Sequence, residues 1–142
     1  MSNKELDSIR TDCAMWFVTE VIGQRWNMNI ILELINAVEH KSKSLAYTDI
    51  ANLIPDISSR TLTRRLKYLE NVGIIEVKNN SKTPKKVRYR LAKSGLRLIP
   101  IIGSLREWSL EFGTTESDEC LNNTCRHSLG IANFVKQLDI IS

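Results

Sequence analysis

The sequence predicts a mostly helical α+β fold in which two short helices, joined by a tight turn, are followed by a β-hairpin. Three observations predict it. Residues 57–75 have a narrow apolar stripe at helical spacing and a broad cationic face. A short amphipathic segment ended by Pro55 comes directly before them, and two short segments rich in β-branched residues come directly after them. Positive charge is concentrated in the same part of the chain.

The stretch ISSRTLTRRLKYLENVGII is the central helix of this prediction. Ser58 is placed to cap its first turn, because a serine hydroxyl accepts from the free N–H groups at a helix start. Leu62, Leu66 and Leu69 recur at i, i+4 and i+7 and form one apolar stripe. Gly73 follows the last turn, where a left-handed residue commonly ends a helix. The helix is therefore expected to bury only a thin edge.

The opposite face of the central helix is cationic and rich in hydrogen-bonding side chains. Arginine binds guanine edges bidentately, while threonine and serine can contact phosphates or bases. The residues expected to contact nucleic acid on this helix are Ser59, Arg60, Thr61, Thr63, Arg64 and Lys67. An ordinary solvated helix would carry similar residues, so the neighbouring segments decide between these two interpretations.

Those segments predict a helix-turn-helix with a wing. A short helix is expected over residues 47–54, and the central helix follows over about 58–72. Residues 74–78 and 87–91 have the pattern of two strands joined by a polar, basic connection over residues 79–86. The expected phosphate contacts of this wing are Lys82, Lys85, Lys86 and Arg88. A lysine-rich hairpin can also serve only to discourage edge pairing.

The charge distribution favours a polyanionic partner. Residues 40–97 hold 14 of the 20 Lys and Arg and 4 of the 16 Asp and Glu, a net of +10, which leaves −6 for the remaining residues. A basic block between acidic ends is typical of a nucleic-acid-binding surface. The polar start and the absence of a long apolar run predict a soluble, cytoplasmic protein with no membrane segment.

Further helices are expected on both sides of the basic block. A first helix begins near residue 13, and a second, over residues 25–38, is apolar around most of its circumference and should be the core pillar. A late helix is expected over residues 93–112 with a kink at Pro100. Its apolar surface exceeds what a small core needs, and a symmetric homodimer is the commonest cover. The expected interface is Trp16, Phe17, Leu98, Ile101, Leu105, Trp108 and Phe112.

The predicted fold class is therefore mostly α (α+β): a winged helix-turn-helix with a two-stranded hairpin wing and additional N- and C-terminal helices in a dimer interface. Residues 1–12 are expected to be a flexible arm. Residues 13–113 form the winged-helix and dimerisation domain. Residues 114–142 form an acidic linker and a C-terminal helix packed on the same domain.

The sequence contains no catalytic or nucleotide-binding motif, so neither an enzyme nor a cofactor is expected. Cys120, Cys125 and His127 are weak candidates for metal ligands, but their spacing is loose. Unliganded cysteines and a disulfide or redox pair remain the alternatives. Cys13 lies in the first helix, where it is either a small buried hydrophobe or a redox-sensing thiol.

The chain resembles the HxlR-type winged helix-turn-helix regulators from Cys13 to about Trp108. The resemblance rests on Cys13 at the first helix, Gly23-Gln24-Arg25-Trp26 before the pillar helix, the central stretch, Pro84 ahead of VRYRL, Gly95 and Trp108. It implies a homodimer that binds double-stranded operator DNA through this domain and regulates transcription, dimerising through its first and late helices. Some members of that family sense oxidants or electrophiles through the equivalent of Cys13. The resemblance does not extend to the C-terminal segment.

Two other functions remain open at this point. A winged helix can instead serve protein–protein assembly inside a transcription or replication complex. Such a module would expose apolar residues on the central helix, whereas this one exposes Arg60, Arg64 and Lys67. A redox-sensing version of the regulator is the other alternative. The sequence does not identify the operator, the direction of regulation or a small-molecule effector.

Overall fold

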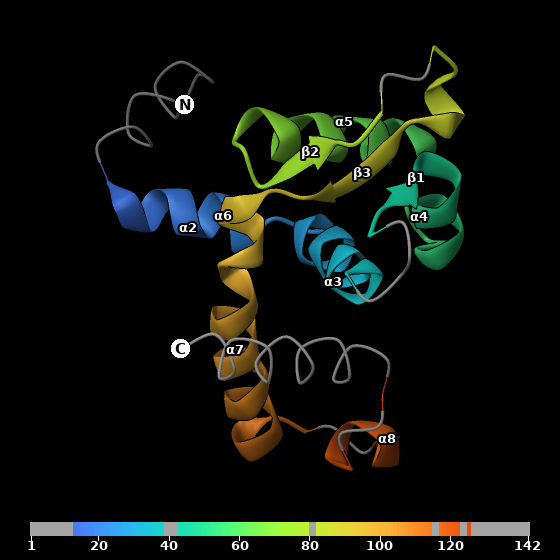
Figure 1. Cartoon of the computed structure of the whole chain (residues 1–142). Coiled ribbons are helices and arrows are strands. Elements are labelled where there is room, and N and C mark those ends of the chain that lie inside the picture. Colours follow the sequence, from blue (N-terminus) through green and yellow to red (C-terminus); the bar gives the residue numbers. More distant parts are fainter. Residues whose placement is uncertain (1–12, 39–42, 80–81, 115–116, 123–124, 126–142) are drawn as a thin grey trace.

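The computed structural model of the chain describes residues 13–38, 43–79, 82–114, 117–122 and 125 (Figure 1). It has the expected winged helix-turn-helix fold. The elements are α2 (Ala14–Ile22), α3 (Asn27–Ala37), β1 (Leu45–Ala46), α4 (Tyr47–Leu53), α5 (Ser59–Asn71), β2 (Ile75–Val77), the 3₁₀-helix η1 (Pro84–Lys86), β3 (Arg88–Leu91), α6 (Lys93–Leu96), α7 (Leu98–Phe112) and α8 (Asp118–Leu121). The predicted arm and the predicted C-terminal helix lie outside the described residues.

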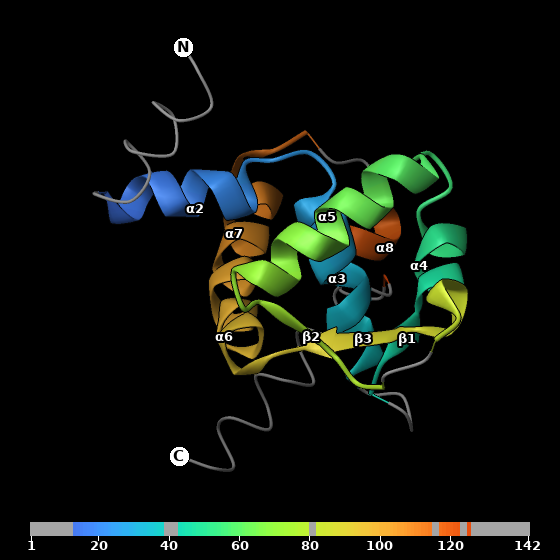
Figure 2. The same cartoon turned by 90° about the horizontal axis from the view of Figure 1, so that it is seen from above.

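The core is built around α3, as its apolar circumference predicts. Ile30, Ile31, Leu34 and Ile35 of this helix are almost completely buried. Helix α5 crosses α3, and the small sheet runs along one side of both helices (Figure 2). The leucine stripe of α5 packs into this core, because Leu62, Leu66 and Leu69 are 0–1% exposed. The core therefore fixes which face of α5 is turned outward.

The wing belongs to a three-stranded antiparallel sheet rather than to a separate two-stranded hairpin. Its strand order is β1-β3-β2, with Leu45 opposite Tyr89 and Ile75 opposite Leu91. Strand β1 lies between the predicted pillar helix and the predicted short helix, where the sequence predicted no strand. A strand of two residues is too short to show an alternation of polar and apolar side chains in the sequence. It forms because pairing with β3 satisfies its backbone hydrogen-bonding groups.

The ends of α5 agree with the prediction. Ser58 is its N-cap, and Gly73 has a φ of +81°, the left-handed conformation that glycine adopts without a steric penalty. The helix before it, α4, is shorter at its end than expected. Ile50 and Ile54 are buried, whereas Leu53 is 36% exposed and does not join the core.

The late helix is broken, and the break lies before the predicted kink. Helix α6 ends at Leu96, Arg97 is the junction, and α7 restarts at Leu98. Pro100 has no N–H for the carbonyl of Leu96, and its ring would clash with that carbonyl in a continuous helix. Restarting the helix puts Pro100 in a first turn, where backbone N–H groups have no intrahelical partner anyway. The expected kink at Pro100 is therefore corrected to a break at Arg97.

Helices α2 and α7 project from the winged part of the chain (Figure 1). Helix α8 follows α7 and begins at Asp118, inside the segment predicted to be a linker, with the Ser117 hydroxyl as its cap. Arg106 of α7 donates to the carbonyl oxygen of Cys120 at 2.9 Å, which attaches α8 to α7. No helix in the described part of the chain has the length and apolarity needed to cross a membrane.

Candidate nucleic-acid interface

At the start of α5, the hydroxyl of the capping residue Ser58 is both a hydrogen-bond acceptor and a hydrogen-bond donor. The Ser58 Oγ accepts from the backbone N–H of Thr61 at 3.2 Å and donates to the Thr61 Oγ1 at 2.9 Å. The cap satisfies an N–H group that the helix itself cannot pair. It also orients the Thr61 side chain, whose hydroxyl keeps its own proton.

The outward face of α5 presents the cationic side chains that the sequence predicted. Ser59, Arg60, Thr63, Arg64 and Lys67 are exposed, and Thr61 is half-buried. Arg60, Arg64 and Lys67 form no ion pair with any residue that the structure describes. Three positive charges on one helix face are therefore available to an anionic partner.

The wing carries further cations. Lys82 and Lys86 are exposed, and Lys85 lies next to Lys86 in η1. Asn79 braces the base of the wing, because its Nδ2 donates to the Lys86 carbonyl at 3.5 Å and its Oδ1 accepts from the Arg88 N–H at 2.9 Å. Asn79 was not among the predicted interface residues. Its position in an Asn-rich connection could have indicated a side chain that bonds to nearby backbone.

Arg88, predicted as a phosphate contact, makes hydrogen bonds inside the protein. Its Nε donates to the Ser44 hydroxyl at 2.8 Å, and its Nη2 donates to the Ser44 carbonyl at 2.9 Å. Asp49 lies 4.0 Å from its Nη1. The side chain of Arg88 is 33% exposed. Its guanidinium therefore links β3 to the residue before β1, a role that is separate from any contact with DNA.

A cleft separates the start of α5 from the wing. Its volume is about 310 Å³, and its lining residues are Tyr47, Ser59, Thr63, Pro84, Val87 and Tyr89. Burial, then the charge of Glu70 and then Tyr47, raise the pKa of the Tyr89 hydroxyl above its ordinary value of 10.0. Tyr89 therefore stays uncharged at neutral pH. Ser59 and Thr63 were among the predicted interface residues, whereas neither tyrosine was.

These features match a known family of proteins. Residues 21–117 match the HxlR-like helix-turn-helix family. The chain belongs to this family. YvaP, an HTH-type transcriptional regulator of Bacillus subtilis (strain 168), is 30% identical over 93 residues, which cover 66% of this chain and 81% of YvaP. YodB, a regulator from the same strain, is 33% identical over 92 residues, which cover 65% of this chain and 77% of YodB.

Solved structures of related regulators have the same architecture. The reduced form of YodB matches with a TM-score of 0.58 at 31% identity, over 70% of this chain and 93% of YodB. The oxidised form of the redox regulator HypR matches with a TM-score of 0.56 at 27% identity, over 72% of this chain and 100% of HypR. The HxlR-like chain is therefore a DNA-binding transcriptional regulator with a winged helix-turn-helix.

The projecting helices of this HxlR-like protein expose a large apolar surface. On α7, Ile99 and Ile102 face the core, while Ile101, Leu105 and Trp108 are 51%, 43% and 63% exposed. The predicted interface residues that are exposed in the single chain are Trp16, Phe17, Ile101, Leu105, Trp108 and Phe112, and Leu98 is half-buried. An isolated chain thus leaves two helices with apolar faces in water, which is unusual for a stable monomer.

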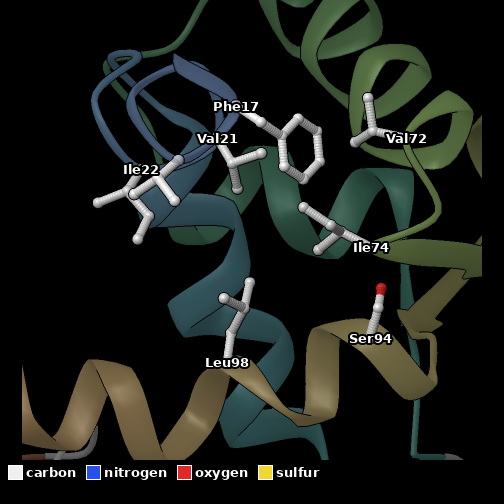
Figure 3. A pocket seen from close by; sticks show the side chains of 8 residues that line it. Phe17, Val21, Ile22, Val72, Ile74, Ser94 and Leu98 are labelled. Atoms are coloured by element: carbon white, nitrogen blue, oxygen red, sulfur yellow. The ribbon is translucent and has the colours of Figure 1, made fainter. Parts of the chain in front are cut away.

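Phe17 is partly exposed to solvent and partly directed toward the body of the HxlR-like domain. Its ring points toward Val72, at the end of α5, across an apolar pocket of about 170 Å³ (Figure 3). Ile74, Ser94 and Leu98 line the same pocket. Helix α2 therefore packs against the end of the cationic helix as well as presenting residues to solvent.

The three cysteines are free. Cys13 is exposed at the N-cap of α2, and Cys120 and Cys125 are half-buried. Cys13 is therefore not the buried hydrophobe that was one of its two interpretations. Among the described residues, no three His, Cys, Asp or Glu side chains are grouped as metal ligands. His127 lies outside them, so the weak metal candidate of Cys120, Cys125 and His127 stays a prediction.

Proposed function

We propose that this HxlR-like regulator acts as a homodimer on double-stranded DNA, with α5 in the major groove and the wing on the adjacent phosphate backbone. The observation that carries the proposal is the outward face of α5. Arg60, Arg64 and Lys67 are exposed there without an ion pair to any described residue. An α-helix fits the major groove, and arginine is the side chain most often bound to guanine there.

The wing supports the same placement. Lys82, Lys85 and Lys86 lie on the connection between β2 and β3, and Pro84 and Val87 of the same connection line the cleft together with Ser59 of α5. Lysine contacts phosphate as a point charge and does not distinguish bases. We assign base contacts to Arg60 and Arg64, and phosphate contacts to the three wing lysines. Regulation then follows from binding and needs no catalytic step, in keeping with relatives that are transcriptional regulators.

A homodimer is proposed because no described residue covers the outer faces of α2 and α7. The faces of these helices that carry Trp16, Leu105 and Trp108 are exposed in the single chain. A two-fold axis that pairs these faces would bury them in a self-complementary interface. Such a dimer would bind two half-sites of one operator.

The salt dependence of DNA binding tests the proposal. Neutralising phosphates releases counterions, so log affinity should fall linearly with log salt, with a slope of about −0.9 for each phosphate contacted. Fluorescence anisotropy of a labelled duplex, titrated with protein at several salt concentrations, measures that slope. A slope near zero, or no binding of any duplex at low salt, would contradict the proposal. An Arg60→Glu/Arg64→Glu variant should lose binding while keeping its circular dichroism spectrum.

A redox-sensing version of this regulator is the second candidate function. It is favoured by the exposure of Cys13 and by the similarity to HypR, which is described as a redox regulator. The function requires that oxidation changes DNA binding, which a comparison of reduced and oxidised protein on one duplex measures.

A further inference from the structure

Tyr47 joins three parts of the proposed DNA-binding surface. Its backbone N–H donates to the Val87 carbonyl, one residue before β3 in the wing, at 3.1 Å. Its hydroxyl donates to the Ser59 carbonyl in the first turn of α5 at 3.0 Å. The same hydroxyl lies 3.3 Å from the Thr63 Oγ1. Tyr47 therefore contacts the wing and the cationic helix, and it lines the cleft between them.

The protons in this cluster can be counted. A carbonyl oxygen can only accept, so the single hydroxyl proton of Tyr47 is used on Ser59. The Tyr47 oxygen must then accept in its contact with Thr63, and Thr63 must be the donor. The proton of the Thr63 hydroxyl is consequently turned toward Tyr47. What Thr63 offers to an outside partner is lone pairs alone.

Thr61, two residues earlier on α5, has the opposite hydrogen-bonding character. Its Oγ1 accepts from Ser58, so its own proton is left for another acceptor. A phosphate oxygen is such an acceptor, whereas Thr63 has no proton to give to a phosphate. The two threonines of one helix turn therefore suit different atoms of DNA.

We propose that Thr63 is a specificity-determining residue that contacts DNA as a hydrogen-bond acceptor only, with Tyr47 as the positioning residue that holds its proton. The inference rests on the proposed placement of α5 in the major groove. The major-groove edges that donate are the amino groups of adenine and cytosine, while guanine and thymine present oxygen acceptors at the corresponding place. Thr63 therefore selects a base that carries an amino group at one position of the operator.

The experiment begins with wild-type protein and a library of random duplexes, from which bound sequences are selected. Competition among four duplexes that differ at one base pair then measures the preference at each position. Wild type should prefer adenine or cytosine at the Thr63 position by about fivefold, the worth of one neutral hydrogen bond. Tyr47→Phe frees the Thr63 proton, so this preference should fall toward equality at that position and at no other.

Three variants of α5 serve as matched controls. Thr63→Val keeps the shape but has no acceptor, so it should lose the same preference at the same position. Thr63→Ser keeps the hydroxyl and its bond to Tyr47, so it should retain the preference. Thr61→Val should weaken binding to all duplexes alike. Thermal unfolding of each variant verifies that its helices are intact.

The results separate this inference from the proposed function. A uniform loss of affinity in Tyr47→Phe with unchanged base preferences would show that Tyr47 is merely structural and would overturn the inference. Changes in Tyr47→Phe and Thr63→Val at different positions would overturn it too, while salt-dependent binding by wild type would leave the proposed function standing. If wild type binds no duplex at low salt, the proposed function fails and the inference fails with it.

Discussion

Arg88 donates twice to Ser44, once to its hydroxyl at 2.8 Å and once to its backbone carbonyl at 2.9 Å. Ser44 is completely buried and directly precedes β1, whereas Arg88 is the first residue of β3. The pair therefore fastens the short strand β1 to the wing strand. A charge-assisted hydrogen bond is about twice as strong as a neutral one, so this contact contributes to the fold.

Replacing Arg88 with alanine should lower the free energy of unfolding by about 1–3 kcal/mol, because Ser44 loses two donors in a buried site. Arg90→Ala is the matched control. Its guanidinium pairs with Glu76 at 2.6 Å, but both side chains are exposed, and such surface pairs contribute about 0.2–1 kcal/mol. Urea unfolding of both variants measures the difference. Equal stability of the two variants would show that Arg88 has no structural role.

The α5 arginines and the wing lysines should differ in what their loss does to DNA binding. Arg60→Ala or Arg64→Ala should cost about 1–3 kcal/mol on the operator and relax the preference at one position. Lys82→Ala or Lys86→Ala should weaken binding to every duplex alike and reduce the salt slope by about one unit. Competition between operator and random duplexes measures both effects.

The opposite pattern would contradict this assignment of roles. If wing variants changed the base preference, the wing would lie in a groove. If α5 variants left the base preference unchanged, α5 would not lie in the major groove. Arg88 is unsuited to this comparison, because its loss is expected to disturb β1 as well as any phosphate contact. Lys82 and Lys86 are exposed, so the loss of either side chain is not expected to disturb β1.

Much of this fold could be predicted because its signals are local. The cap at Ser58, the leucine stripe of α5 and the left-handed Gly73 depend on side chains within a few turns of one another. Their spacing is visible in the sequence and leaves little choice of structure. The cationic face of α5 follows directly, because burial of the stripe fixes the direction of the remaining side chains.

The features that escaped prediction depend on residues that are distant in the chain. Strand β1 exists because β3 pairs with it, and Tyr47 reaches Thr63 only after α4 and α5 are packed. Asn27 gives a similar case: it is completely buried, and its Nδ2 donates to the Glu20 carbonyl at the end of α2. The sequence shows a polar residue in an apolar helix, but it does not show which distant backbone group that residue will bond.

A charge in the middle of the α7 stripe should dissociate the proposed dimer. Trp108→Glu is the sharpest change, because Trp108 is 63% exposed in the single chain and its ring contacts Phe112, with 6.1 Å between the ring centroids. An unpaired charge buried at an interface is strongly unfavourable, so the variant should sediment as a monomer at micromolar concentration. Its fold should persist, because the core face of α7 carries Ile99 and Ile102 instead.

Glu107→Lys is the control for this change. The Glu107 side chain is 77% exposed and lies about 100° around α7 from Trp108, away from the apolar stripe, so reversing its charge should leave the dimer intact. Analytical ultracentrifugation of wild type and both variants gives the comparison. A wild-type protein that sediments as a monomer would contradict the dimer, and so would a Trp108→Glu variant that remains dimeric.

The cysteines should be dispensable for DNA binding under reducing conditions. All three are free, and none of them lies on α5 or in the wing. A Cys13→Ser/Cys120→Ser/Cys125→Ser variant should therefore dimerise and bind DNA with unchanged affinity when a thiol reductant is present. Under a mild oxidant, only the wild type should respond if Cys13 is a sensor, and restoring Cys13 alone should restore that response.

Loss of binding by the reduced triple variant, with its circular dichroism spectrum unchanged, would instead make a cysteine or a metal bound by it part of the DNA-binding mechanism. Zinc titration followed by elemental analysis of the wild-type protein would then distinguish the thiols themselves from a metal site that includes Cys120 and Cys125.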